Sequence, residues 1–214
     1  MSFQPRQSFF SVVFYFGIVC LAIGATILLV TFFPVIKNEL NYDLFHPTTF
    51  VEVAIKKPKN SAVPATTPVD ANFGIVIPKI GANARIIPGV DAYDSRIYQY
   101  ALTKGVAQAK GSSLPGQNGD LFVFAHSSVN FYDALRYNSI FYLLTKLEKN
   151  DPVYVFYQKK KYTYTVTGKQ ITDPEKVFIS GQTAGTQTIT LMTCWPPGTS
   201  IKRLLVFGKL TSVN

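Results

Sequence analysis

The sequence predicts a mainly β domain, either a closed barrel or a sandwich, that follows one transmembrane helix. A run of 25 uncharged residues near the N-terminus predicts the helix. From residue 73 onward, about eight short β-type runs alternate with glycine, proline and asparagine turn signals, while helical patterns are sparse. Many short strands at this spacing are typical of all-β barrels and sandwiches.

Composition excludes several other classes of protein. The chain has 214 residues, of which 47% are hydrophobic and 15% are charged, with a formal net charge of +9. A disordered polar chain is poor in apolar residues, so that class is excluded. Two cysteines are too few for a disulfide-dense small domain or a four-cysteine zinc site. Arg6 is the only charged residue among the first 33, so residues 34–214 retain +8 of the charge.

The apolar run Phe9–Phe33 is long enough for a membrane anchor, because about 20 apolar residues cross a bilayer core. A cleavable signal peptide has an apolar core of only about 7–15 residues, so we favour an anchor over a cleaved signal or a buried helix. Arg6 precedes the run, whereas Lys37 and Glu39 after it cancel. The positive-inside rule then predicts an N-terminus inside the cell and an extracytoplasmic domain.

Three segments follow from this pattern. Residues 1–33 form a cytoplasmic tip and the anchor. Residues 34–72 form a spacer that contains five prolines and a small basic cluster, and its stretch 61–68 is typical of a semi-extended linker. Residues 73–214 form the β domain.

The β domain is predicted to contain the following strands in order: Gly74–Pro78, Ala84–Ile87, Gly105–Ala109, Leu121–His126, Val153–Gln158, Tyr162–Thr172, Thr188–Cys194 and Leu204–Leu210. Helices are expected near Tyr93–Leu102 and Tyr132–Leu147. The lysines at 159–161 are expected at a hairpin tip, where they are more often solvated than bound to phosphate, so nucleic acid is not an expected partner.

Cys194 ends a strand and lies on its less apolar face. Period two places Ile189 and Leu191 on one face, and Thr190, Met192 and Cys194 on the other. Strand ends beside loops are common places for reactive groups. The alternative is a small buried hydrophobic side chain. Cys20 lies in the anchor, so the two cysteines are not expected to pair.

Two further residues lie at strand ends. His126 ends a hydrophobic strand, where the alternative is a hydrogen-bonded core histidine, and the other histidine, His46, lies in the spacer. Arg203 begins the last predicted strand, nine residues after Cys194. If these two strands pair antiparallel, Arg203 faces Cys194, and a cation there can stabilise a thiolate or an oxyanion. A solvated arginine is the alternative.

Together these segments resemble the sortases, the membrane-anchored cysteine transpeptidases of bacteria. Thr-Leu-Met-Thr-Cys at 190–194 resembles their Thr-Leu-x-Thr-Cys motif, and Ile75–Gly81 is similar to their opening strand. Further similarities, in family order, are Gly-Val-Ala at 105–107, Leu-Pro-Gly at 114–116, Gly-Asp at 119–120, Phe-Ala-His at 124–126 and Arg-Leu-Leu-Val at 203–206. The sequence departs from the family pattern at Ala125, at Asn150 and at the bulky Trp195, which leaves subclass and substrate preference open.

The resemblance implies a closed eight-stranded β-barrel and an activity. The family cleaves a C-terminal sorting signal of the Leu-Pro-x-Thr-Gly type in exported proteins, through a thioester, and transfers them to an amine of the cell envelope. Cys194 would be the nucleophile, His126 the general acid and base, and Arg203 the group that stabilises oxyanion and substrate. Expected substrate-binding residues are Thr193, Trp195, Ile171, Val177, Phe178 and Ile179, for the last four of which barrel packing is the alternative.

The resemblance implies no cofactor. Some sortases bind calcium, for which only weak candidates exist here: Glu148, Asp151, Asp173 and Glu175. The expected location is the bacterial cell membrane, with one span, and the lipid bilayer is a partner through residues 9–33. An alternative is a pilin-polymerising sortase, which the lack of a second apolar segment and of an Asp-Pro-aromatic lid motif in 34–72 disfavours.

Two alternatives lie outside this family. One is a non-catalytic anchored β domain that binds anionic envelope polymers through its basic surface. The other, a papain-like protease, fits poorly, because its cysteine would begin a helix and precede the histidine in the chain.

Overall fold

The computed structural model describes residues 12–29, 67–127, 140–179 and 185–214. Most of the predicted spacer and residues 132–139 of the second predicted helix lie outside these ranges. The chain divides into two compact units, Met1–Val51 and Glu52–Asn214, each of which is described by itself.

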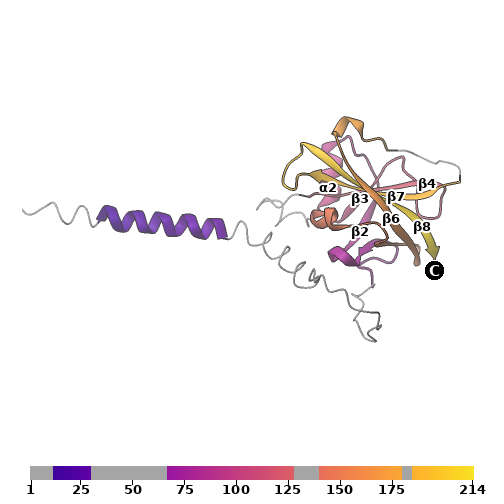
Figure 1. Ribbon diagram of the computed structural model, residues 1–214, viewed down its shortest axis with the longest axis horizontal. Coiled ribbons are helices and arrows are strands. Elements are labelled where there is room, and N and C mark those ends of the chain that lie inside the picture. Colours follow the sequence, from indigo (N-terminus) through magenta and orange to yellow (C-terminus); the bar gives the residue numbers. More distant parts are fainter. Residues whose placement is uncertain (1–11, 30–66, 128–139, 180–184) are drawn as a thin grey trace, which may run out of the picture. The chain divides into compact units, whose positions relative to one another are not determined.

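The described part of the first unit is one helix, Val12–Leu29, drawn in indigo in Figure 1. Its 18 residues have a mean hydropathy of 2.6, and none is buried within the molecule. The hydroxyl of Thr26 donates to the carbonyl of Ala22, which satisfies this polar group within the helix itself. By length and composition the helix is sufficient to cross a membrane.

The second unit contains a closed barrel of eight strands (Figure 1). The strands are β1 (Phe73–Ile77), β2 (Ala82–Val90), β3 (Val106–Ala109), β4 (Gly119–Phe124), β5 (Pro152–Tyr157), β6 (Lys160–Thr172), β7 (Gln187–Trp195) and β8 (Lys202–Val213). Their order around the barrel is β1-β2-β3-β4-β7-β8-β6-β5. The pairs β2–β3 and β4–β7 are parallel and the others are antiparallel. The predicted eight-stranded barrel is therefore confirmed, and the sandwich is excluded.

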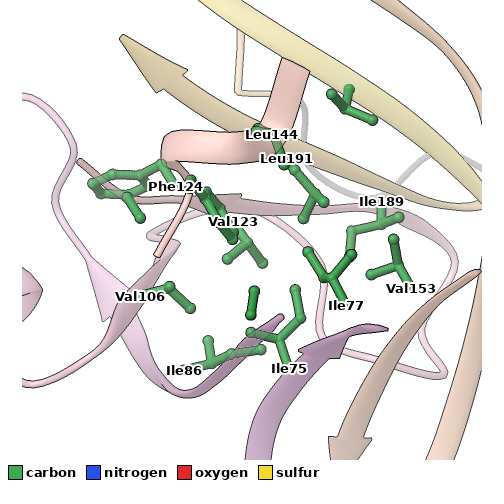
Figure 2. Packing of buried hydrophobic residues seen from close by; sticks show 14 of the residues in the cluster. Ile75, Ile77, Ile86, Val106, Val123, Phe124, Leu144, Val153, Ile189 and Leu191 are labelled. Carbon is green, nitrogen blue, oxygen red and sulfur yellow. The ribbon is translucent and has the colours of Figure 1, made fainter. Parts of the chain in front are cut away.

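The alternation of side chains along the strands builds the core. Ile189 and Leu191 point into it from β7, beside Ile75 and Ile77 of β1, as Figure 2 shows. Tyr162, Tyr164 and Val166 of β6 are all buried, as their shared face predicts. Burial in this apolar interior raises the pKa of Tyr164 well above its usual range.

Short helices lie between strands of the barrel. The helix α2 (Ser95–Leu102) lies where a helix is predicted, and the Asp94 carboxylate caps it by accepting from the backbone N–H groups of Arg96 and Ile97. The other helices are single turns of 3₁₀ type: η1 (Pro78–Ile80), η2 (Tyr142–Lys146) and η3 (Pro174–Lys176). In the second predicted helical region, the described residues thus form only η2.

One predicted boundary is wrong in a way that matters for the site. The strand expected to reach His126 ends at Phe124, because pairing with β3 stops at Ala107 and Phe124. Contact with β7 continues, since Ala125 N–H donates to the Met192 carbonyl at 3.1 Å. His126 therefore follows the barrel wall instead of belonging to it.

We expect Leu191→Ala to lower the free energy of unfolding by about 2–5 kcal/mol, since Leu191 is fully buried and its loss leaves a cavity that close-packed neighbours cannot fill. Chemical denaturation followed by far-UV circular dichroism measures the change. The matched control is Ile201→Ala at an exposed position, where a change within about 0.5 kcal/mol is expected. Equal effects at the two positions would contradict the core assignment.

Candidate active site

Cys194 and Arg203 lie directly opposite each other at one end of the barrel. They are register partners in the antiparallel pair of β7 and β8, as their spacing predicts. The Arg203 guanidinium is held against the connecting loop, because its Nη1 donates to the carbonyls of Ser200 at 3.0 Å and Lys202 at 3.1 Å. The Cys194 thiol is half-buried and forms no disulfide.

His126 reaches the same end of the barrel through a parallel pair. β4 and β7 run side by side in register, with Phe124 opposite Met192, so their carboxyl ends lie at one edge. Past the end of β4, the Thr193 hydroxyl donates to the Ala125 carbonyl at 3.0 Å. His126 lies two residues after Phe124, and Cys194 lies two residues after Met192, so both residues stand at this edge of the barrel.

A cleft of about 460 Å³ joins these three residues. Its polar side is formed by His126, Ser127, Cys194, Arg203 and the loop residues Gly198, Thr199 and Ser200. Its apolar side is formed by strand residues Phe124 and Met192 and by Tyr98 and Leu102 of α2. A volume of this size with few convergent polar groups is typical of a ligand site. Sequence patterns did not indicate the contribution of α2, because nothing local shows where a helix packs.

The predicted substrate-binding residues fall in different places. Thr193 lines the cleft, but it is buried and its hydroxyl is engaged by Ala125. Trp195, Val177 and Ile179 are partly buried and pack against the core. Ile171 is exposed on β6, opposite Leu204. Phe178 is 81% exposed and lines a second cleft.

The second cleft, of about 430 Å³, lies over the outer faces of β4, β7 and β8. Successive outward pairs of β4 and β7 connect it with the first cleft: Asp120 with Thr188, Phe122 with Thr190, and Phe124 with Met192. Asp120 is mostly buried there and accepts a hydrogen bond from the Thr188 hydroxyl at 2.7 Å. Burial raises the pKa of Asp120, although the hydroxyl of Thr188 opposes this shift.

We expect Asp120→Asn to raise the melting temperature at pH 7. A carboxyl whose pKa is raised in the folded state costs stability when it is ionised, and this cost disappears as the pH falls below its unfolded value of about 3.9. The asparagine oxygen can still accept from Thr188. Calorimetry at pH 7 and pH 3 should therefore show a stabilisation at pH 7 that vanishes at pH 3.

The matched control is Asp70→Asn, which we expect to lower the melting temperature at pH 7. The Asp70 carboxylate accepts from the backbone N–H of Asn72 at 2.8 Å, and this bond lowers the pKa of Asp70. Its stabilising effect is present above the unfolded pKa and is lost as the pH falls through the folded one. A change of the same sign for both variants would contradict the account given for Asp120.

Three of the four carboxylates considered for calcium are paired with lysines. Glu148 and Asp151 both accept from Lys79 Nζ, each at 2.9 Å, and Asp173 accepts from Lys176 at 2.9 Å. Within the described ranges, no three His, Cys, Asp or Glu residues are grouped so that they could hold a metal ion. That the chain needs no cofactor stays a prediction.

Comparison with known proteins decides the family. A model of the sortase domain matches residues 75–211. The chain belongs to the sortase family. This match confirms the resemblance found in the sequence, and it covers all eight strands except the outermost residues of β1 and β8.

Similar sortases include both characterised sequences and solved structures. Sortase D of Bacillus subtilis is 29% identical over 136 residues, which cover 62% of this chain and 60% of that protein. Sortase A of Streptococcus agalactiae is 26% identical over 137 residues, which cover 64% of this chain and 51% of that protein. The crystal structure of sortase C-1 from Actinomyces oris has a TM-score of 0.55 at 31% identity, over 67% of this chain and 76% of the other. Sortase A from Corynebacterium diphtheriae, a lid mutant, has a TM-score of 0.55 at 26% identity, over 68% and 72%.

Proposed function

We propose that this sortase is a membrane-anchored cysteine transpeptidase that cleaves a C-terminal sorting signal of the Leu-Pro-x-Thr-Gly type. It would join the exported protein to an amine of the cell envelope. The observation that carries the proposal is the meeting of Cys194, His126 and Arg203 in one cleft. A nucleophile, a proton carrier and a fixed cation at one site are the groups that acyl transfer requires.

In the first half of the reaction, the Cys194 thiolate attacks the carbonyl carbon of the threonine and forms a carbon–sulfur bond. Arg203 stabilises the negative charge on the carbonyl oxygen. Its Nη1 is engaged by the loop, and the guanidinium carries five N–H donors in all, so others remain to face the substrate. His126 gives a proton to the departing glycine nitrogen as the carbon–nitrogen bond breaks, which leaves a thioester.

In the second half, an envelope amine attacks the thioester. His126 takes the proton from the attacking nitrogen, a new amide bond forms, and the Cys194 thiolate leaves. The outward-facing residues of β4 and β7 that connect the two clefts are suited to bind the part of the peptide that precedes the scissile bond. Phe178 at its far end offers an exposed apolar surface for the substrate leucine.

The helix Val12–Leu29 supports the anchor in this proposal. With Arg6 on the inner side, the barrel would stand outside the cytoplasm, where exported substrates and envelope amines meet.

A peptide library tests the proposed function. The full chain in lipid nanodiscs is incubated with quenched Leu-Pro-x-Thr-Gly peptides that vary at x and at flanking positions. We expect cleavage between threonine and glycine, a mass adduct on Cys194, and faster product release when a primary amine is added. If no peptide leaves an adduct on Cys194, the non-catalytic polymer-binding domain becomes the better explanation.

We expect Arg203→Ala to lower kcat/KM by about 10²–10³-fold, the usual effect of removing a group that stabilises an oxyanion. The acylation rate from stopped-flow fluorescence measures it. The matched control is Lys202→Ala, the neighbouring cation, which lies 3.8 Å from Asp173 and lines neither cleft. A loss below threefold for Arg203→Ala, or an equal loss for both variants, would remove Arg203 from the mechanism.

A further inference from the structure

The helix α2 and the turn before it present an exposed apolar face. Tyr93, Ile97 and Tyr100 are 82%, 48% and 64% exposed. Ile97 and Tyr100, three positions apart, lie on one side of the helix, and Tyr93 lies in the turn just before its N-cap Asp94. On the opposite side, Tyr98 and Leu102 line the cleft that holds Cys194. The helix is thus apolar on both sides, although only one side is covered by the barrel.

Basic residues border this face. The Lys104 ammonium lies 4.1 Å from the centre of the Tyr100 ring, and the Arg96 side chain is almost fully exposed, with its Nη2 3.6 Å from the Asp94 carboxylate. The nearby acidic groups are engaged locally. Asp94 caps the helix, and Asp91 accepts from the backbone N–H of Tyr93 at 2.9 Å. Tyrosine and isoleucine beside arginine and lysine form the composition that favours the boundary between lipid headgroups and acyl chains.

We propose that this face, Tyr93, Ile97 and Tyr100 with Arg96 and Lys104, docks on an anionic lipid bilayer. The proposal rests on the proposed function, in which the helix Val12–Leu29 anchors the chain. The 37 residues from 30 to 66 separate that helix from the described part of the barrel unit, and a chain of that length spans at most about 130 Å, so the bilayer is within reach. The charge of +8 on residues 34–214 is complementary to anionic headgroups.

Docking would orient the active site. Since α2 lines the catalytic cleft with its inner side, contact of its outer side with lipid brings the cleft edge to the membrane surface. A substrate whose sorting signal is followed by about 20 apolar residues would itself be held in the membrane before cleavage. The docked enzyme would therefore place its cleft at the bilayer surface, where the scissile bond of such a substrate leaves the membrane.

Radical footprinting tests the docking. The full chain is placed in nanodiscs of phosphatidylcholine alone or with phosphatidylglycerol, and oxidation of each tyrosine is followed by mass spectrometry. We expect oxidation of Tyr93 and Tyr100 to fall at least threefold with phosphatidylglycerol, and to return in 0.5 M NaCl. Unchanged oxidation would overturn the proposal. Protection that is equal in both lipids and at both salt concentrations would also overturn it and would point to another segment or a second copy. Protection only after an anionic wall polymer is added would assign the face to that polymer.

A variant separates docking from catalysis. Tyr93→Ser, Ile97→Ser and Tyr100→Ser together should leave cleavage of a soluble peptide unchanged. They should slow cleavage of a membrane-tethered substrate at least threefold in anionic nanodiscs. The control is Val69→Ser with Val213→Ser, at exposed apolar positions elsewhere on the unit. Equal rates on the tethered substrate for both variants would overturn the proposal. Failure of the wild type on every peptide would instead reject the proposed function, and footprinting would still report on docking.

Discussion

We expect replacement of Cys194 with alanine to remove the acyl-enzyme and to lower peptide cleavage at least about 10⁴-fold. The methyl group cannot form the thioester, so the reaction loses the step that divides one difficult displacement into two easier ones. The remaining binding groups, including Arg203, can still hold the peptide. We therefore expect peptide affinity to change little, which fluorescence anisotropy measures alongside cleavage.

The chain supplies its own control for this result. Cys20 lies in the N-terminal helix, so Cys20→Ala should keep full activity. A Cys194→Ala protein that still cleaves at more than 1 in about 10³ of the normal rate would show that another group is the nucleophile.

Replacing His126 with alanine should lower kcat about 10²–10⁴-fold, the range that a positioned acid or base contributes. The loss should be greatest for peptides with a poor leaving amine, because these depend most on protonation of the departing nitrogen. A thioester or activated ester substrate, whose leaving group needs no proton, should lose much less. The acylation rates of the two substrate types, measured in single turnovers, give the difference, because both substrates share the later attack on the thioester.

The matched control for His126 is the other histidine of the chain, His46, which lies outside the described residues. His46→Ala should leave both substrate types unaffected. If His126→Ala slowed acylation by the peptide and by the activated ester equally, His126 would act on the thiol and not on protonation of the leaving nitrogen.

Local patterns in the sequence were sufficient for the strands and for half of the site. Alternating side chains define each strand, and the eight residues with two prolines between Cys194 and Arg203 are enough to predict that these two residues face each other. Local patterns could not predict closure into a barrel, because no residue within a strand indicates which distant strand it pairs with or in what register. The prediction of a closed barrel, and of one site that contains both His126 and Cys194, came from the resemblance to a family.

Other features lay beyond what the sequence could show. The end of β4 at Phe124 depends on where its antiparallel neighbour β3 begins, and no residue within β4 indicates that position. The contribution of Tyr98 and Leu102 to the cleft depends on how α2 packs. The expected apolar pocket is only partly formed by the predicted residues, because Val177 and Ile179 pack against the core while Phe178 is exposed.

The parallel pairing of β4 with β7 also bears on how the protein folds. Thr193 bonds to Ala125 across 68 positions of the chain, and β7 must enter between β4 and β8 for the barrel to close. Contacts of such long sequence separation form slowly, since their loop entropy is lost before any stabilisation is gained. The thiol, the imidazole and the guanidinium thus assemble only when the last strands have joined. We therefore expect the chain to stay inactive until β8 has joined the barrel, and a fragment that ends before β8, and so lacks Arg203, to be inactive.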